Sequence, residues 1–159
     1  MIEYDYVVVG TGVSGLSFAL EASKYGRVAV ITKRASENSN TSWAQGGICC
    51  VADDNDSFES HIKDTIDAGA GLCDYDVVKT IVESAPDAID KMVNIGVQFD
   101  KKSNGNYELG KEGGHSQRRV LHSKDTTGKE ISEKLILSAK SSKNIKIFEH
   151  HFAIDVVTT

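Results

Sequence analysis

Glycines at positions 10, 12 and 15 come directly after a run of three valines, residues 7–9, and open a segment with helical periodicity. A turn with Gly-x-Gly-x-x-Gly spacing between a strand and a helix allows a tight reversal and leaves backbone amides facing a pyrophosphate. The spacing therefore predicts a site for the pyrophosphate of a dinucleotide at this turn. It leaves open which dinucleotide binds there.

The residues after the second expected strand bear on that choice. In NAD sites an acidic residue about twenty positions beyond the turn accepts hydrogen bonds from the ribose hydroxyls. Here the corresponding residues are Thr32, Lys33 and Arg34, and none is a carboxylate. From the residues alone, Lys33 and Arg34 either bind the 2′-phosphate of NADP or form a solvated pair at a strand end.

A second candidate lies in "EGGHSQRR", residues 112–119, where two glycines separate an acid from imidazole and guanidinium groups. The segment is consistent with an anion-binding loop and equally with a charged turn. The histidines show no metal-ligand spacing, so surface or core roles are favoured for all of them: His61, His115, His122, His150 and His151.

Three cysteines, Cys49, Cys50 and Cys73, are an odd number without C-x-x-C spacing. This pattern suggests neither a disulfide framework nor a zinc site. Cys49 and Cys50 lie in "GGICCVA", which has the composition of a short buried strand. A packing role is favoured for them, with a redox pair as the alternative.

The elements that must position these groups begin with a β-α-β unit: a strand at 4–9, a helix at 14–24 and a strand at 27–32. Residues 33–47 are polar, lack hydrophobic periodicity and predict a long functional loop. A residue pair at capping-box spacing, Asp56 and Glu59, predicts a helix that ends at Gly69 or Gly71.

The rest of the chain continues as a mixture of helices and strands. A helix is expected from about Asp74, with Pro86 starting a new helical turn and Gly96 ending it. Short strands are expected within 97–109 around an Asn-Gly turn. Thr127 and Glu130 predict a further capped helix, and strands are expected at 145–148 and 152–157. The fold class is α/β.

Length and composition limit the number of domains and the kinds of partner that the chain can have. A chain of 159 residues fits one ordinary domain and requires no second core. The net charge of -5 argues against a nucleic-acid partner. Residues 1–6 carry two acids where a signal peptide carries basic charge, and no apolar run approaches the ~20 residues that span a bilayer. A cytoplasmic protein without a membrane partner is expected.

Several segments in order carry a resemblance: "GTGVSGLSFAL", "VITK", "NTSWAQGGI", "DTIDAGAGLCD" and "EGGHSQRRVLHSKDTTGKE". Together they resemble the fumarate reductase and succinate dehydrogenase flavoprotein family, and within it the members that oxidise L-aspartate. The resemblance spans essentially the whole chain. It implies a Rossmann-like FAD-binding domain, of which residues 1–159 are the N-terminal part, truncated before the capping domain.

The resemblance also implies FAD as the cofactor, with Lys33 near the adenosine ribose, which removes the NADP interpretation. In membrane-complex relatives a histidine in the loop is bonded covalently to the flavin, and the matching residue here is Asn40. An amide cannot form that bond, so non-covalent FAD is expected. The implied cofactor-binding residues are Gly10, Thr11, Gly12, Val13, Ser14, Gly15, Lys33, Asn40, Thr41, Ser42, Trp43, Ala44, Gln45, Gly46 and Gly47.

Glu112 is the implied substrate-binding residue. Dicarboxylate-specific relatives carry a neutral residue at this position, whereas a carboxylate can pair with the ammonium of aspartate. The implied reaction is oxidation of L-aspartate to iminoaspartate, with oxygen or fumarate as acceptor and quinolinate synthase as a functional partner in NAD synthesis.

The family's catalytic residues lie beyond this chain, so residues 1–159 alone are expected to be inert, with exposed strand edges near 145–157. The alternatives are a succinate or fumarate oxidoreductase and a stand-alone nucleotide-binding module.

Overall fold

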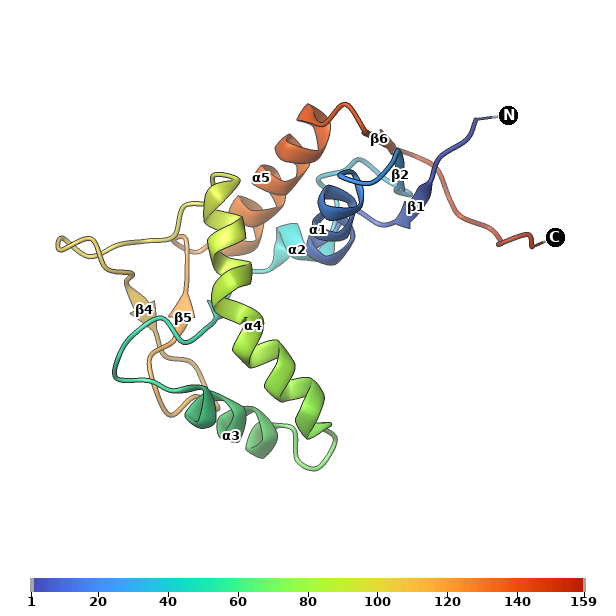
Figure 1. Cartoon of the computed structure of the whole chain (residues 1–159). Coiled ribbons are helices and arrows are strands. Elements are labelled where there is room, and N and C mark those ends of the chain that lie inside the picture. Colours follow the sequence, from blue (N-terminus) through green and yellow to red (C-terminus); the bar gives the residue numbers. More distant parts are fainter. Residues whose placement is uncertain (1, 159) are drawn as a thin grey trace. The chain divides into compact units, whose positions relative to one another are not determined.

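The computed structural model describes residues 2–158 and divides them into two compact units. Unit 1 contains the chain up to Ala44 and from Gly128 onward, and unit 2 contains Gln45–Thr127. Both units are drawn in Figure 1. Each has buried apolar residues of its own, whereas chain length alone required only one core.

Unit 1 is built on a three-stranded parallel sheet with the order β1-β2-β6. The strands are β1 (Tyr6–Val9), β2 (Val28–Ile31) and β6 (Ile145–Phe148). β1 and β2 pair in the register Tyr6↔Val28 and are joined through helix α1 (Val13–Ala22), because parallel strands need a crossover connection. The β-α-β unit predicted from the sequence is therefore confirmed.

The apolar positions of α1 explain its packing. Leu16 and Ala19 are fully buried, as are Val28 and Val30 in the central strand β2. β1 lies at the sheet edge, and its Val7 and Val9 side chains remain exposed. Helix α5 (Thr127–Ser141) adds Leu135 and Ala139 to the buried set of unit 1.

Two expectations for unit 1 are wrong. The loop at 33–47 contains a short helix, α2 (Asn40–Trp43), because the Ser39 side chain accepts a hydrogen bond from the Ser42 amide and caps it. Residues 152–157 form no strand; within the described chain no neighbouring strand pairs with them, and their apolar side chains, including Ile154, are exposed.

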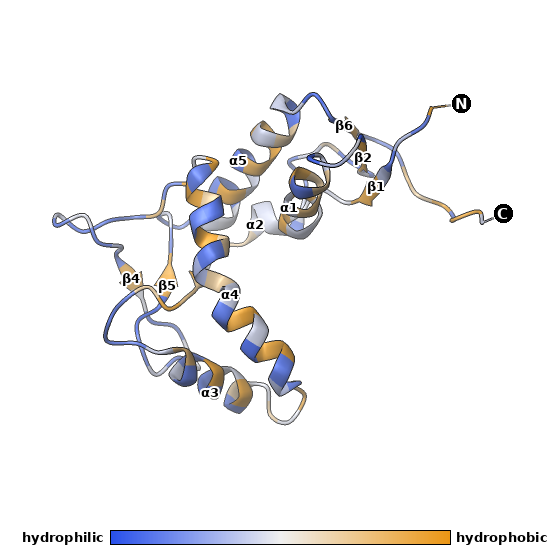
Figure 2. Cartoon of the chain, in the orientation of Figure 1, coloured by the Kyte–Doolittle hydropathy of each residue, from blue (hydrophilic) through white to orange (hydrophobic). Residues whose placement is uncertain are grey.

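Unit 2 begins with strand β3 (Ile48–Cys49), followed by helices α3 (Phe58–Ala68) and α4 (Tyr75–Asn94). Figure 2 shows hydrophobic and hydrophilic residues alternating in groups along α4. Its apolar stripe packs against α3, where Ile62, Val78 and Val82 form the centre of the cluster. Pro86 lies inside α4 and does not begin a new helix, which differs from the expectation.

The ends of these helices also differ from the sequence prediction. Ser57, and not Asp56, caps α3 by accepting a hydrogen bond from the Ser60 amide. The Asp56 carboxylate instead binds Arg119. At the start of α5, the Thr127 hydroxyl accepts a hydrogen bond from the Ser123 amide at 3.0 Å.

A small antiparallel sheet completes unit 2, with the order β3-β5-β4. It includes β4 (Leu109–Gly110) and β5 (Val120–Leu121). Before β4, a single bridge between Lys101 and Tyr107 closes the Asn-Gly turn. Among the helices of residues 2–158, none is long and apolar enough to cross a membrane.

Candidate nucleotide-binding site and a buried arginine cluster

The main candidate site in unit 1 is a cavity of about 500 Å³ at the carboxyl ends of the parallel strands. Ligands of open α/β sheets bind at this edge, because the loops that follow the strands meet there. The cavity is lined by Val9, Gly10, Thr11, Gly12, Ile31, Thr32, Lys33, Asn38, Ser39, Asn40, Thr41, His151, Phe152 and Ala153.

The glycine turn has the geometry that its spacing predicts. Gly10 has φ +109°, a conformation that side chains disfavour, and its amide donates to the Ile31 carbonyl at 2.8 Å. A Cβ on Gly15 would lie 2.3 Å from the Gly10 carbonyl oxygen, so the helix can approach the turn this closely only with glycine there. Within residues 2–158, the amides of Gly12 and Ser14 have no intramolecular acceptor, which leaves them available to an anion.

The polar loop at 33–47 contacts this turn directly. The Val13 amide donates to the Thr41 hydroxyl at 3.0 Å. A Cβ on Gly12 would lie only 3.3 Å from the same hydroxyl oxygen. Asn40 and Thr41 both line the cavity, so the structure brings these predicted residues together with the glycine turn.

The other rim of the cavity consists of residues that follow β2 and β6. Lys33 is exposed and lines the cavity. His151–Ala153 line it too, and the His151 amide is anchored by a hydrogen bond to the Thr32 carbonyl at 3.0 Å. This last segment was not predicted from the sequence. The available signal was its position directly after a strand that pairs with β2.

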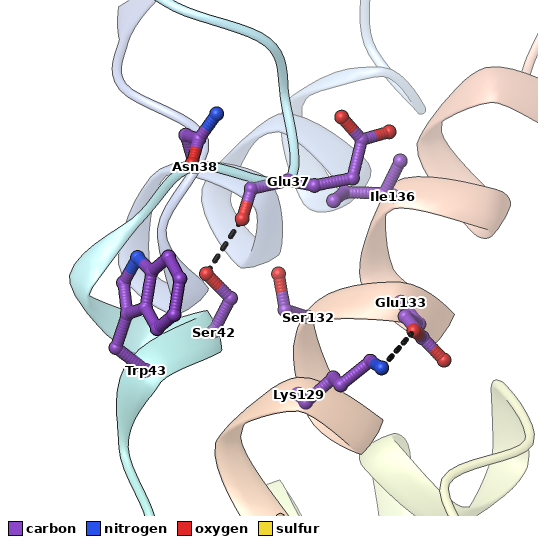
Figure 3. Close-up of a pocket in the computed structure, with 8 residues that line it drawn as sticks. All are labelled: Glu37, Asn38, Ser42, Trp43, Lys129, Ser132, Glu133 and Ile136. Carbon is purple, nitrogen blue, oxygen red and sulfur yellow. Dashed lines mark hydrogen bonds and ion pairs between the residues drawn. The ribbon is translucent and has the colours of Figure 1, made fainter.

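Ser42 and Trp43, two further predicted cofactor residues, line a different cavity of about 320 Å³ against α5. Figure 3 shows the Trp43 indole at one side of this cavity and Ile136 at another. Its charges are paired, since Lys129 lies 3.8 Å from Glu133 and Glu37 binds Lys140. The Trp43 side chain is 74% exposed.

In unit 2, the predicted Gln45–Gly47 segment lies beside Glu112. A Cβ on Gly46 would lie 3.6 Å from a Glu112 carboxylate oxygen. The Glu112 side chain is exposed, as is Gln45. Gly47 has a structural reason to be glycine, because a Cβ there would lie 2.3 Å from the Leu121 carbonyl oxygen.

The unexpected feature of unit 2 is Arg119, whose side chain is completely buried. Its Nε and Nη2 donate to both carboxylate oxygens of Asp56, at 2.7 and 2.8 Å. Its Nη1 donates to Asp64 at 2.6 Å and lies 3.3 Å from His115 Nδ1, and Nη2 also reaches the Ser60 hydroxyl at 3.0 Å. Because every donor of Arg119 is occupied, this guanidinium is not free to bind an anion.

The cluster shifts the titration of its members. Burial alone would raise the pKa of Asp64, but hydrogen bonds from Ser116 and Arg119 outweigh it and hold that pKa well below its usual range. Burial alone would also raise the pKa of Asp56, but Arg119 and the hydrogen bond from the Ser57 amide together outweigh it, so that pKa is lowered. Burial, followed by the charge of Arg119, lowers the pKa of His61, whose Nδ1 has no hydrogen-bond partner among the described residues.

The cysteines occupy different surroundings. Cys50 is buried, and burial with the neighbouring Cys49 raises its pKa to about 11. Cys49 is half-buried, with its Sγ 3.4 Å from His115 Nε2. All three cysteines are free thiols. No group of three potential ligands in residues 2–158 is arranged to hold a metal ion.

The parallel sheet, the strained glycine turn and the open amides define a dinucleotide-binding α/β protein. Residues 5–159 match the family model described as "FAD binding domain". The chain belongs to this family, and FAD is its cofactor. A Rossmann-like FAD-binding fold, as the sequence predicted, is therefore confirmed.

Comparisons with individual proteins agree with this family. The chain is 47% identical over 98% of its length to a chloroplastic L-aspartate oxidase from Oryza sativa, and 42% identical over 97% to the L-aspartate oxidase of Vibrio cholerae. It spans only 24% and 30% of those two proteins. Among solved structures, it matches the E. coli quinol fumarate reductase at 30% identity with a TM-score of 0.93, covering 99% of this chain and 28% of that one.

The cavity of unit 1 fits the family's cofactor. The glycine turn lines this cavity, and the absence of side chains at Gly10 and Gly12 leaves its backbone accessible. An extended dinucleotide needs binding groups beyond the pyrophosphate site. Lys33 and His151–Ala153 line the same cavity beyond the glycine turn.

Proposed function

We propose that this chain is the N-terminal FAD-binding part of an L-aspartate oxidase, which converts L-aspartate to iminoaspartate. The observation that carries the proposal is the position of Glu112, whose exposed carboxylate lies over Gly46 in a segment expected to line the flavin. The similarity to L-aspartate oxidases over nearly all of this chain supports it.

The residues of unit 1 bind and orient the cofactor in this proposal. The turn from Gly10 to Gly15 holds the pyrophosphate through its amides, while Lys33 and the 151–153 segment contact the adenosine end. Asn40 and Thr41 continue the site towards the flavin, followed in sequence by Ser42–Gly47. When bound, FAD supplies the redox chemistry by accepting a hydride from the substrate's α-carbon.

Glu112 provides selectivity for an amino acid. Its carboxylate pairs with the ammonium group of aspartate, which succinate and fumarate lack. Without that ammonium, the carboxylate repels the carboxylates of a dicarboxylate substrate. The remaining positioning and proton-transfer groups belong to parts that this chain does not contain, so residues 1–159 alone do not turn over L-aspartate.

The test requires a complete enzyme, and a chimera supplies one. Residues 1–159 replace the matching segment of the Vibrio cholerae L-aspartate oxidase, and Glu112→Gln is compared with the unmodified chimera. We expect kcat/KM for aspartate to fall at least tenfold more than kcat/KM for fumarate, with Glu108→Gln as an exposed control. Equal losses for both substrates would overturn the role of Glu112.

A second candidate is a succinate or fumarate oxidoreductase, which the high structural similarity to quinol fumarate reductase favours. The same chimera distinguishes the two, since in a dicarboxylate enzyme Glu112→Gln would leave the ratio of kcat/KM for aspartate to kcat/KM for fumarate unchanged. A stand-alone nucleotide-binding module is the remaining alternative. It would bind FAD as residues 1–159 and have no catalytic continuation.

The proposed L-aspartate oxidase activity also implies an electron acceptor, a partner enzyme and a cellular compartment. Fumarate or oxygen serves as the electron acceptor, and quinolinate synthase uses the unstable imine product. The cytoplasmic location stays a prediction, because plant relatives are described as chloroplastic. Co-purification of quinolinate synthase activity with the full-length enzyme would support the proposed link.

A further inference from the structure

We infer that Arg119 and Asp64 are positioning residues: together they fix the loop at 111–118, hold the His115 ring with Nδ1 as acceptor and Nε2 as donor, and keep the Glu112 carboxylate over Gly46. This inference rests on the proposed function only where it concerns Glu112 and the substrate. The tautomer and the loop geometry are properties of residues 1–159 by themselves.

The tautomer follows from the hydrogen bonds of Arg119. A guanidinium only donates, so His115 Nδ1, at 3.3 Å from Arg119 Nη1, must accept. A neutral imidazole that accepts at Nδ1 carries its proton on Nε2. That Nε2–H points to Cys49 Sγ at 3.4 Å, which is therefore the acceptor of this contact.

A proton on Nδ1 would face the positive guanidinium at the same short distance. That arrangement would break the contact, so Nδ1 carries no proton while Arg119 donates to it. The groups around it include His61, whose ring centroid lies 5.8 Å away, and the carboxylates of Asp56 and Asp64, which are already engaged by Arg119. The His115 ring is thus held in one orientation, with Nε2 as its donor.

The loop is fixed through Asp64. One oxygen of its carboxylate accepts hydrogen bonds from the Ser116 amide at 2.7 Å and the Ser116 hydroxyl at 2.8 Å, as well as from Arg119. Lys111 Nζ donates to the Ser116 carbonyl at 2.8 Å and ties the start of the loop to its middle. Asp64 lies on α3, so a buried ion pair connects the loop to a helix.

The consequence for Glu112 comes from the short span of this loop. The His115 amide donates to the Glu112 carbonyl at 3.2 Å, and Gly114 has φ +85° between them. The Arg119 amide also donates to the Gly110 carbonyl at 3.1 Å. Glu112 therefore lies between two fixed points of the backbone, which limit the positions that its exposed side chain can reach.

The first experiment measures the tautomer in the 159-residue chain by ¹⁵N NMR of histidine side chains. We expect His115 to show a protonated Nε2 and an unprotonated accepting Nδ1, and Arg119→Lys to abolish that preference. If Arg119→Lys does not fold, Asp64→Asn tests the same orientation, with Asp67→Asn on the same helix as the matched control. A proton on Nδ1 in the unmodified chain would overturn the inference.

The second experiment is a double-mutant cycle in the chimera described above. Asp64→Asn should lower selectivity for aspartate over fumarate by several-fold, and Asp67→Asn should leave it unchanged. In the Glu112→Gln background, Asp64→Asn should have no further effect on selectivity, because it acts through Glu112.

The outcomes distinguish the positioning role of Asp64 from the proposed function of Glu112 in substrate selectivity. Additive effects of Asp64→Asn and Glu112→Gln on selectivity would overturn the positioning role. A Glu112→Gln variant with unchanged selectivity would overturn the proposed function, while the NMR result still decides the tautomer.

Discussion

Replacing Gly15 with alanine tests the glycine turn, because local helix propensity and close packing predict opposite results. Gly15 lies in the first turn of α1, where alanine is favoured over glycine by about 1 kcal/mol. The packing in the structure predicts that alanine at this position is less stable than glycine. The new Cβ would lie 2.3 Å from the Gly10 carbonyl oxygen, 3.2 Å from its carbon and 3.3 Å from Val8 Cγ1.

The size of the effect follows from these distances. To restore an ordinary contact, the Gly10 carbonyl must move by about 1 Å, and overpacking of this kind costs about 1–3 kcal/mol. After the gain in helix propensity, we expect Gly15→Ala to destabilise the chain by about 0–2 kcal/mol. Because the amides of the same turn face the pyrophosphate, FAD affinity should fall about tenfold or more, which corresponds to ~1.4 kcal/mol.

The assay combines thermal unfolding with titration of FAD into the purified chain. Gly113→Ala is the matched control, since a Cβ there meets nothing within 4 Å. The control should bind FAD like the unmodified chain. A Gly15→Ala variant that is more stable and binds FAD with unchanged affinity would refute the packing argument.

Three further predictions follow from described features. Trp43 is the single tryptophan, so FAD binding should quench the chain's tryptophan fluorescence; an unchanged signal at saturating FAD would contradict the placement of α2 beside the cofactor. Acid precipitation of the FAD-loaded chain should release all flavin, because the Asn40 amide is no nucleophile; yellow colour in the pellet would show a covalent bond. The lowered pKa of His61 means that the unfolded state binds a proton first as pH falls below about 6.5, so the unfolding temperature should drop from pH 7 to 5. His61→Asn should flatten that dependence, and an unchanged pH profile would count against it.

The predictable part of this fold was local. The strand–turn–helix at 6–22 could be read from the sequence because its glycines and apolar residues act on near neighbours. Pro86 was misread because a proline about three turns into an amphipathic helix can be tolerated when the apolar stripe continues on both sides, as it does from Val82 to Ile89. Apolar and polar residues alternate along 152–157 as they do in a strand, but a strand also needs a neighbouring strand to pair with.

The site was predictable to a similar degree. Asn40, Thr41 and Lys33 line the predicted cavity, whereas the contribution of His151–Ala153 depends on the pairing of β6 with β2. The Arg119 cluster joins residues 63 and 55 positions apart, and no spacing rule connects an arginine to carboxylates at such separations. Interpreting "EGGHSQRR" as either an anion site or a charged turn missed that its second arginine is buried.

The order in which unit 1 is assembled along the chain has a consequence for biosynthesis. Its cavity is formed by residues 9–41 and 151–153, and unit 2 is inserted between them. A hydrogen bond from the Ser36 amide to Glu149 joins the two parts across 113 positions. During translation, unit 2 can therefore fold as a continuous segment while the nucleotide cavity still lacks one wall. The complete cavity can form only after residues 151–153 have left the ribosome, because their position depends on the late pairing of β6 with β2.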